Sequence, residues 1–205
     1  MNEALGDISF VTRGGVRVRR LAQNAGEGVA VIASCREALD TRRGAVFSSD
    51  YEYPGRYTRW DIGFVDPPLS LTARGREVAI SALNARGLAL LPGIRDIVQT
   101  ADWLLRVESG PSELQLHVRE PKQLFTEEER IKQPTAFSAV RTIVALFGNG
   151  ECPHLGLYGA FGYDLAFQFD PITKRIARGA GGRDLVLYLP DEIVVVDHHL
   201  SLIHI

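Results

Sequence analysis

The groups best suited to hold a ligand gather in one stretch of the chain. This stretch, Phe47–Asp61, reads FSSDYEYPGRYTRWD and holds four aromatic side chains beyond Phe47, two arginines and three carboxylates. Flat apolar rings beside a few charged groups are typical of a site for a small molecule. We therefore predict that Phe47–Asp61 is a binding segment for a small aromatic molecule.

The residue types around this stretch meet the needs of a bound amino acid. Such a ligand needs an acceptor for its ammonium group, donors for its carboxylate and an apolar slot for its side chain. Carboxylates accept hydrogen bonds, and hydroxyls donate or accept them. An arginine binds a carboxylate through two parallel hydrogen bonds. The candidates are Val46 and Phe47 for the slot, Ser48, Ser49 and Asp50 for polar contacts, Arg56 or Arg59 for the carboxylate, and Tyr57. Composition alone favours a simpler alternative, in which Ser-Ser-Asp is a turn and the aromatics are core residues.

Signatures of common enzyme classes are absent from the sequence. It contains no G-x-x-x-x-G-K-[ST], no G-x-S-x-G and no H-E-x-x-H. Cys35 and Cys152 are far apart and form no CxxC pair, which is typical of a reduced cytoplasmic protein. Because Cys35 falls on the apolar stripe of a predicted helix, we interpret it as a core residue and not as a nucleophile.

The bulk composition is that of an ordinary globular protein. The chain has 205 residues, 45% hydrophobic and 23% charged, with a formal net charge of -2. No basic stripe indicates nucleic acid, no apolar run reaches membrane-spanning length, and the N-terminus lacks a secretory pattern. We expect a cytoplasmic protein that binds neither nucleic acid nor membrane.

Short β-rich runs and a few helical stripes alternate along the chain. A hairpin is predicted around Gly14-Gly15, because adjacent glycines supply the positive φ of tight turns. Helices are predicted over Val29–Arg42 with Gly44 as C-cap, Pro92–Leu104, Glu127–Lys132 with Thr126 as N-cap, and Pro134–Phe147. Further strands are predicted over Ala45–Ser49, Arg56–Asp66, Leu69–Arg74, Glu77–Leu83, Leu88–Leu91, Glu113–Arg119, Leu155–Phe169, Leu185–Leu189 and Ile193–Asp197. This order indicates an α+β protein with a mainly antiparallel β-sheet and packed helices.

A second stretch, Leu155–Asp170, reads LGLYGAFGYDLAFQFD and alternates small residues with aromatics. Glycine inside a strand marks a bulge or the close approach of another backbone. We predict a central strand that is covered on both faces and has a mainly structural role.

Together the two stretches resemble anthranilate synthase component I, in the form fused to its glutamine amidotransferase. FSSDYEYPGRYTRWD is similar to the tryptophan-binding segment of that family. LYGAFGYDLAFQFD, followed by RDLVLYLPDEIVVVDH, is similar to its later N-terminal strands. The resemblance runs from Phe10 to His198 and implies the N-terminal half of the fold of chorismate-utilising enzymes.

The resemblance implies an activity for a longer enzyme. The family converts chorismate and glutamine into anthranilate, pyruvate and glutamate, requires Mg²⁺, and is inhibited by L-tryptophan bound in its N-terminal region. Its chorismate- and magnesium-binding residues lie in a C-terminal region that has no counterpart here. We therefore expect no catalytic residue, metal or cofactor in this chain, and no anthranilate from it alone. The expected partners are L-tryptophan, chorismate through the missing region, and a glutamine amidotransferase domain or subunit.

The resemblance also implies roles for single residues. Ser49 matches the central tryptophan-binding serine of the family, and Val46, Phe47, Ser48 and Asp50 flank it. Many relatives have Leu-Glu-Ser where this chain has Phe47-Ser48-Ser49, and the fused forms usually have Asn in place of Asp50. A carboxylate in place of an amide adds a charge beside a zwitterionic ligand. That charge either strengthens the contact with the ammonium group or repels the carboxylate of the ligand.

Two other interpretations stay open. Aminodeoxychorismate synthase shares the fold, although the stretch Phe47–Asp61 argues against it. A standalone amino-acid-binding regulator without a catalytic half is the second alternative. A native stop codon near His199 and a soluble chain that binds tryptophan would identify such a regulator.

The last six residues, Leu200–Ile205, read LSLIHI, which is one translation of the sequencing adapter CTGTCTCTTATACACATC. We hypothesise that residues 1–199 are a truncated, tryptophan-sensing N-terminal region and that residues 200–205 derive from the adapter. A natural strand is the alternative, because the composition is strand-like. Re-amplifying the locus from source DNA should give a different continuation after His199. A native continuation that encodes LSLIHI would contradict the hypothesis.

Overall fold

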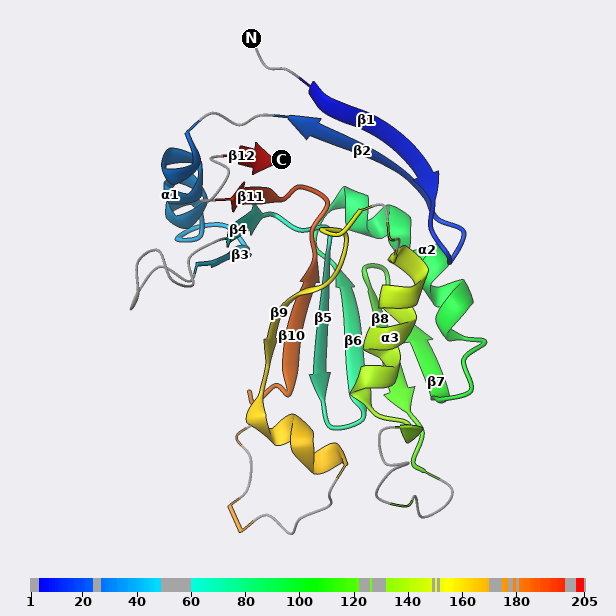
Figure 1. Cartoon of the computed structure of the whole chain (residues 1–205). Helices are drawn as coiled ribbons and strands as arrows, with labels where there is room; N and C mark the ends of the chain where they lie inside the picture. The colour runs from blue at the N-terminus through cyan, green and yellow to red at the C-terminus, as the bar shows by residue number, and fades with distance from the viewer. Residues whose placement is uncertain are drawn as a thin grey trace. The chain divides into compact units, whose positions relative to one another are not determined.

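The computed structural model describes residues 4–23, 27–48, 60–121, 126, 132–148, 150, 152–169, 175–176, 179, 181–197 and 202–204. Its elements fall into two compact units (Figure 1). The first unit comprises residues 1–67, 147–156 and 190–205, and the second comprises residues 68–146 and 157–189. Antiparallel sheets and packed helices build both units, which confirms the predicted α+β class.

The first unit contains the predicted hairpin, formed by β1 (Ala4–Val11) and β2 (Arg17–Gln23). Its turn holds Gly15 at φ +83°, a conformation that glycine adopts without strain. The Thr12 hydroxyl accepts a hydrogen bond from the backbone N of Val16 at 3.0 Å. On the outer face, Arg19 Nη2 donates to Asp7 Oδ2 at 2.6 Å, and this hydrogen bond lowers the pKa of the Asp7 carboxyl.

A four-stranded antiparallel sheet forms the rest of the first unit, in the order β12-β11-β4-β3. The strands are β3 (Gly44–Phe47), β4 (Trp60–Val65), β11 (Val194–Asp197) and β12 (Leu202–His204). Helix α1 (Gly28–Ala38) covers one face, where Ile32 packs with Val194 and Val196. The pairing of β12 with β11 fits either origin of the last six residues, because an open strand edge pairs with any strand-forming segment.

The structure corrects the predicted end of α1. The helix ends at Ala38 and not at Arg42. Gly44 is no helix cap: it opens β3, and a Cβ at this position would lie 2.1 Å from the carbonyl oxygen of Phe64. The close approach of β4 therefore explains this glycine. Arg42 instead binds Asp66, with 2.5 Å between Nη2 and Oδ2, and this hydrogen bond raises the pKa of Arg42.

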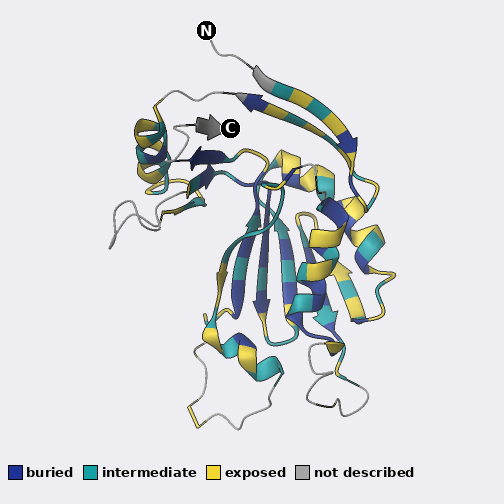
Figure 2. Cartoon of the chain, viewed as in Figure 1, coloured by how far each residue is buried: buried dark blue, intermediate teal, exposed yellow. Residues whose placement is uncertain are grey.

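The second unit is built on a six-stranded antiparallel sheet in the order β7-β8-β6-β5-β10-β9. The strands are β5 (Leu69–Arg74), β6 (Glu77–Ala82), β7 (Leu104–Ser109), β8 (Glu113–Val118), β9 (Tyr158–Phe161) and β10 (Leu185–Leu189). One face is buried and the other partly exposed, so that Leu114, Leu116 and Val118 of β8 are buried while the residues between them are not (Figure 2). This alternation is the pattern that predicts these strands.

Two helices, α2 (Ala85–Val98) and α3 (Ala136–Phe147), pack on the buried face of this sheet. A small apolar pocket is lined by Ile94 of α2, Ile143 of α3, and Leu71 and Ile80 of the sheet. Both helices therefore contribute to the same core layer (Figure 1).

The structure also corrects the prediction around Pro92. The predicted strand Leu88–Leu91 is wrong, because one helix, α2, runs through both this run and the proline. Asn84 is the N-cap of this helix, and its side-chain oxygen accepts a hydrogen bond from the backbone N of Gly87 at 3.1 Å. The predicted extension of the helix to Leu104 is wrong as well, since Leu104 opens β7, which pairs with β8.

The stretch Leu155–Phe169 is not the central strand that its composition predicts. Only Tyr158–Phe161 pairs as a strand, β9, which lies at the edge of the sheet beside β10. A 3₁₀ helix, η2 (Tyr163–Gln168), follows it. The predicted close approach does occur, because a Cβ on Gly159 would lie 2.0 Å from the carbonyl oxygen of Val186.

Parts of three predicted elements lie outside the described residues. They are Ser49 of the predicted strand Ala45–Ser49, residues 56–59 of the predicted strand Arg56–Asp66 and residues 127–131 of the predicted helix after Thr126.

Two glycines of α2 give a test of this packing with opposite expected signs. A Cβ on Gly87 would lie 2.0 Å from the carbonyl oxygen of Pro68, so Gly87→Ala should lower the free energy of unfolding by about 1–3 kcal/mol. Gly93 has no neighbour within 4 Å of the corresponding position, so Gly93→Ala should raise it by up to about 1 kcal/mol through helix propensity. Urea unfolding followed by circular dichroism measures both. Equal effects of the two substitutions would contradict the packing of α2.

Candidate functional site

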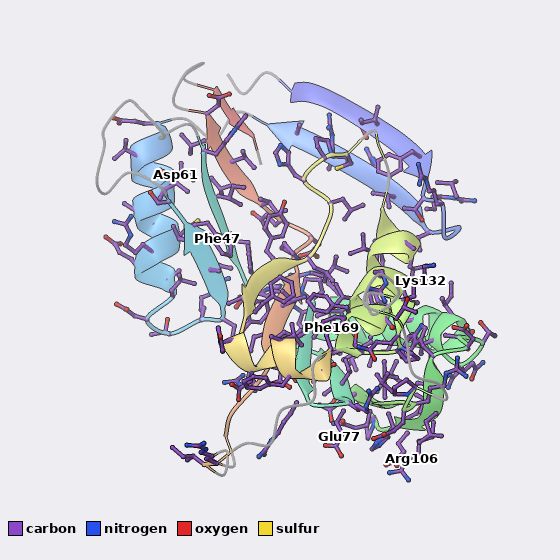
Figure 3. The ribbon with its side chains drawn as sticks, turned by 60° about the horizontal axis from the view of Figure 1, so that its bottom comes forward. Phe47, Asp61, Glu77, Arg106, Lys132 and Phe169 are labelled. Atoms are coloured by element: carbon purple, nitrogen blue, oxygen red, sulfur yellow. The ribbon has the colours of Figure 1, made fainter. Side chains whose placement is uncertain are left out.

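The structure describes three of the predicted ligand residues, all at the end of β3. Val46 and Phe47 are the last residues of β3, and Ser48 follows as an exposed residue. The other predicted contacts, Ser49, Asp50, Arg56 and Tyr57, lie outside the described residues, as does Arg59. Figure 3 labels Phe47 on β3 and Asp61 on the neighbouring strand β4.

Pairing between β3 and β4 sends Val46 and Phe47 to opposite faces of the sheet. Val46 lies opposite Gly63 and packs against the core cluster of Ile32, Val194 and Val196 beneath α1. Phe47 lies opposite Ile62 and faces the other way, because successive side chains of a strand alternate. The two residues predicted to line one slot therefore contribute to two different surfaces.

The face that carries Phe47 is rich in aromatic rings. Phe47 is 38% exposed and packs on the buried Phe64, with 6.5 Å between ring centroids and 37° between ring planes. Trp60 is 39% exposed and meets the His154 ring edge-on at 6.5 Å and 62°. This arrangement offers a partly open, apolar surface for a flat ring.

Trp60 is a candidate that the residue list from the sequence leaves out. The alternation predicted for Arg56–Asp66 already puts Trp60, Ile62 and Phe64 on one face of a strand. The exposure of Trp60 and its nearness to Phe47 depend on the pairing of β3 with β4, which the pattern alone does not specify.

Cys35 fits the interpretation as a core residue. It is half-buried, packs against the cluster beneath α1, and would lie 3.4 Å from a Cβ on Gly63. Burial, together with the charge of Glu192, raises the pKa of the Cys35 thiol. A raised pKa leaves little thiolate at neutral pH, so this thiol is a weak nucleophile.

The part of the chain that the structure describes offers no ligand set for a metal ion. Within it, no three side chains of the His, Cys, Asp and Glu types gather in a suitable arrangement. The described residues therefore do not fit the Mg²⁺ that the resemblance implies for the longer enzyme.

The second aromatic stretch packs at the edge of the second unit's sheet, where Leu165 is buried while Phe161 and Tyr163 stay exposed. Phe137 of α3 stacks on Phe161 of β9 at 5.5 Å and contacts Phe169 at 5.8 Å (Figure 3 labels Phe169). Gln168 accepts a hydrogen bond from the backbone N of Ala136 at 2.9 Å and donates to the carbonyl of Gly75 at 2.8 Å. These contacts hold η2 against the start of α3, which is a structural role.

Comparison with known proteins gives matches of one kind. The chain is 46% identical to an anthranilate synthase of Azospirillum brasilense over 195 residues, which are 95% of this chain and 26% of that protein. It is 27% identical over 150 residues to the pyocyanine-specific anthranilate synthase component 1 of Pseudomonas aeruginosa, covering 72% of this chain and 27% of the relative. It is 28% identical over 136 residues to anthranilate synthase component 1 of Serratia marcescens, covering 65% of this chain and 25% of the relative.

This chain is homologous to the anthranilate synthases. It spans about a quarter of the length of the curated relatives that it matches. No family model matches the chain. Among the described residues, none of the helices has the length and apolar character needed to cross a membrane.

Proposed function

We propose that this chain is the tryptophan-sensing N-terminal region of a glutamine-dependent anthranilate synthase. The observation that carries the proposal is the identity of 46% across nearly the whole chain, combined with coverage of only 26% of the relative. The enzyme as a whole would convert chorismate and glutamine into anthranilate, pyruvate and glutamate in the cytoplasm. Chorismate, Mg²⁺ and the glutamine amidotransferase would bind outside this chain.

The sensing role would lie at the end of β3 and in the residues that follow it. L-tryptophan would meet Ser49 and Asp50 through its polar groups, Arg56 with Tyr57 through its carboxylate, and an aromatic surface through its indole ring. The structure supports the contact with the indole ring, since Phe47, at the end of β3, lies on a partly exposed aromatic face. Val46 would contribute indirectly, because its packing against the core cluster beneath α1 holds β3 in place.

The first test is the activity of the chain alone. Incubated with chorismate, Mg²⁺ and either glutamine or ammonium, it should form no anthranilate, because the proposal places the chorismate site outside it. Product fluorescence measures the outcome, with a full-length synthase as positive control. Clear formation of anthranilate by the isolated chain would refute the proposal that the chorismate site lies outside it.

A second test addresses the sensing residue. In the full-length synthase, Ser49→Phe should raise the tryptophan concentration for half-inhibition by at least about tenfold, because the phenylalanine ring is larger than the serine side chain and fills the proposed slot. Inhibition is measured as the ratio of rates with and without tryptophan, so that it is independent of the basal rate. Ser109→Phe, at an exposed serine of β7, is the matched control and should leave half-inhibition unchanged. Equal inhibition of the Ser49→Phe and parent enzymes would remove Ser49 from the site.

A further inference from the structure

We propose that β7, an edge strand of the six-stranded sheet, pairs antiparallel with β7 of a second copy of this chain about a two-fold axis at Val107. This axis places Arg106 of each copy opposite Glu108 of the other. Self-association through β7 does not depend on tryptophan sensing, and its absence would leave the proposed function in place.

The backbone of β7 is open on one side. Among the described strands, β7 is bonded to β8 alone (Figure 1). At the turn between them, the backbone N of Gly110 donates to the carbonyl oxygen of Glu113 at 2.8 Å. Bonded and non-bonded residues alternate along an antiparallel pair, so Glu108 also bonds to β8, whereas Val107 and Ser109 direct their N–H and C=O groups outward. This edge therefore offers donors and acceptors to a further strand.

The charged side chains of this edge are self-complementary. Arg106 and Glu108 are two residues apart in β7 and point to the same face of the sheet (Figure 3 labels Arg106). Their side chains are 60% and 59% exposed, with 3.1 Å between Arg106 Nη2 and Glu108 Oε1. Pairing about Val107 would add two contacts between copies, so that four charges of alternating sign lie side by side. Opposite charges directly across two strands stabilise their pairing.

The neighbouring registers lack this match. An axis at Arg106 would put two guanidinium groups opposite each other, and an axis at Glu108 would do the same with two carboxylates, which destabilises a sheet. An axis at Leu105 or Ser109 would bring neither charge opposite its counterpart. The charge pattern therefore selects the axis at Val107, where two β-branched side chains also meet.

Pairing in this register would also cover an exposed apolar residue. Leu105 is the extra residue of a bulge between Leu104 and Arg106, and it is 69% exposed. In the proposed dimer it lies beside Ser109 of the second copy. Removal of this side chain from water favours association.

Charge reversal tests the surface directly. Arg106→Glu and Glu108→Arg each turn two attractive pairs into two repulsive ones, so each should weaken self-association of the chain by at least about tenfold. An equimolar mixture of the two variants should associate as the parent does, because two glutamates of one copy then face two arginines of the other. Sedimentation velocity over a concentration series measures the mass, and recovery in the mixture also shows that both variants fold.

A proline variant tests the backbone contacts. Val107→Pro removes an N–H group that faces outward, while the hydrogen bonds between β7 and β8 remain. It should weaken self-association by at least about tenfold and keep the circular dichroism spectrum of the parent. Val107→Thr retains the N–H group and the branched side chain. It is the matched control and should associate as the parent does.

Each outcome decides for or against the β7 dimer. A parent chain that stays monomeric up to its solubility limit would overturn it, and so would a dimer that any of the three weakening variants leaves intact, since another surface would then hold it. Charge-reversed variants that stay monomeric when mixed would overturn the pairing of Arg106 with Glu108. A parent dimer that single reversals dissociate, mixing restores and Val107→Pro abolishes supports the axis at Val107.

Discussion

The first unit depends on β4, which is hydrogen-bonded to β3 on one side and to β11 on the other. Because side chains alternate along each strand, this register decides which residues lie beneath α1 and which lie on the opposite face. The core beneath α1 therefore contains Val46, Val194 and Val196. The opposite face carries Phe47 and Trp60. A slip of one residue would exchange the two sets, so the proposed ligand surface and the core are specified by the same pairing.

The second unit depends on side chains that satisfy distant backbone groups. Arg76 Nη1 donates to the carbonyl oxygens of Arg119 and Pro134 at 2.8 and 2.7 Å, and Gln168 bridges Ala136 to Gly75. Buried carbonyl and amide groups cost free energy when they lack a partner. These long side chains therefore tie the turn between β5 and β6 to Arg119 after β8 and to Pro134 and Ala136 at the start of α3.

Much of this fold follows from local patterns in the sequence. The glycine pair predicts the β1–β2 hairpin, and alternation predicts most strands of both units.

The errors in the predicted elements have physical causes. The run before Pro92 is apolar enough for a strand, yet Asn84 caps it as a helix, which continues through the exposed proline although proline donates no hydrogen bond. In Leu155–Phe169, the backbone N of Gly162 donates a hydrogen bond to the carbonyl of Asp184, and η2 replaces the expected strand from that point.

For the candidate site, sequence resemblance supplies Ser49 and its neighbours. The place of Trp60 beside Phe47 depends on the pairing of β3 with β4, which forms through tertiary contacts.

The order of the strands has a consequence for how the protein is made. β4 meets β3 soon after both leave the ribosome, but its other partner, β11, is encoded after the whole of the second unit. Domains tend to fold as they emerge, and contacts between distant segments form late. The nascent first unit therefore carries an open β4 edge through most of its synthesis, which makes this edge a natural target for a chaperone or for mispairing. The face of the sheet that carries Phe47 is complete only after Val194–Asp197 has joined it.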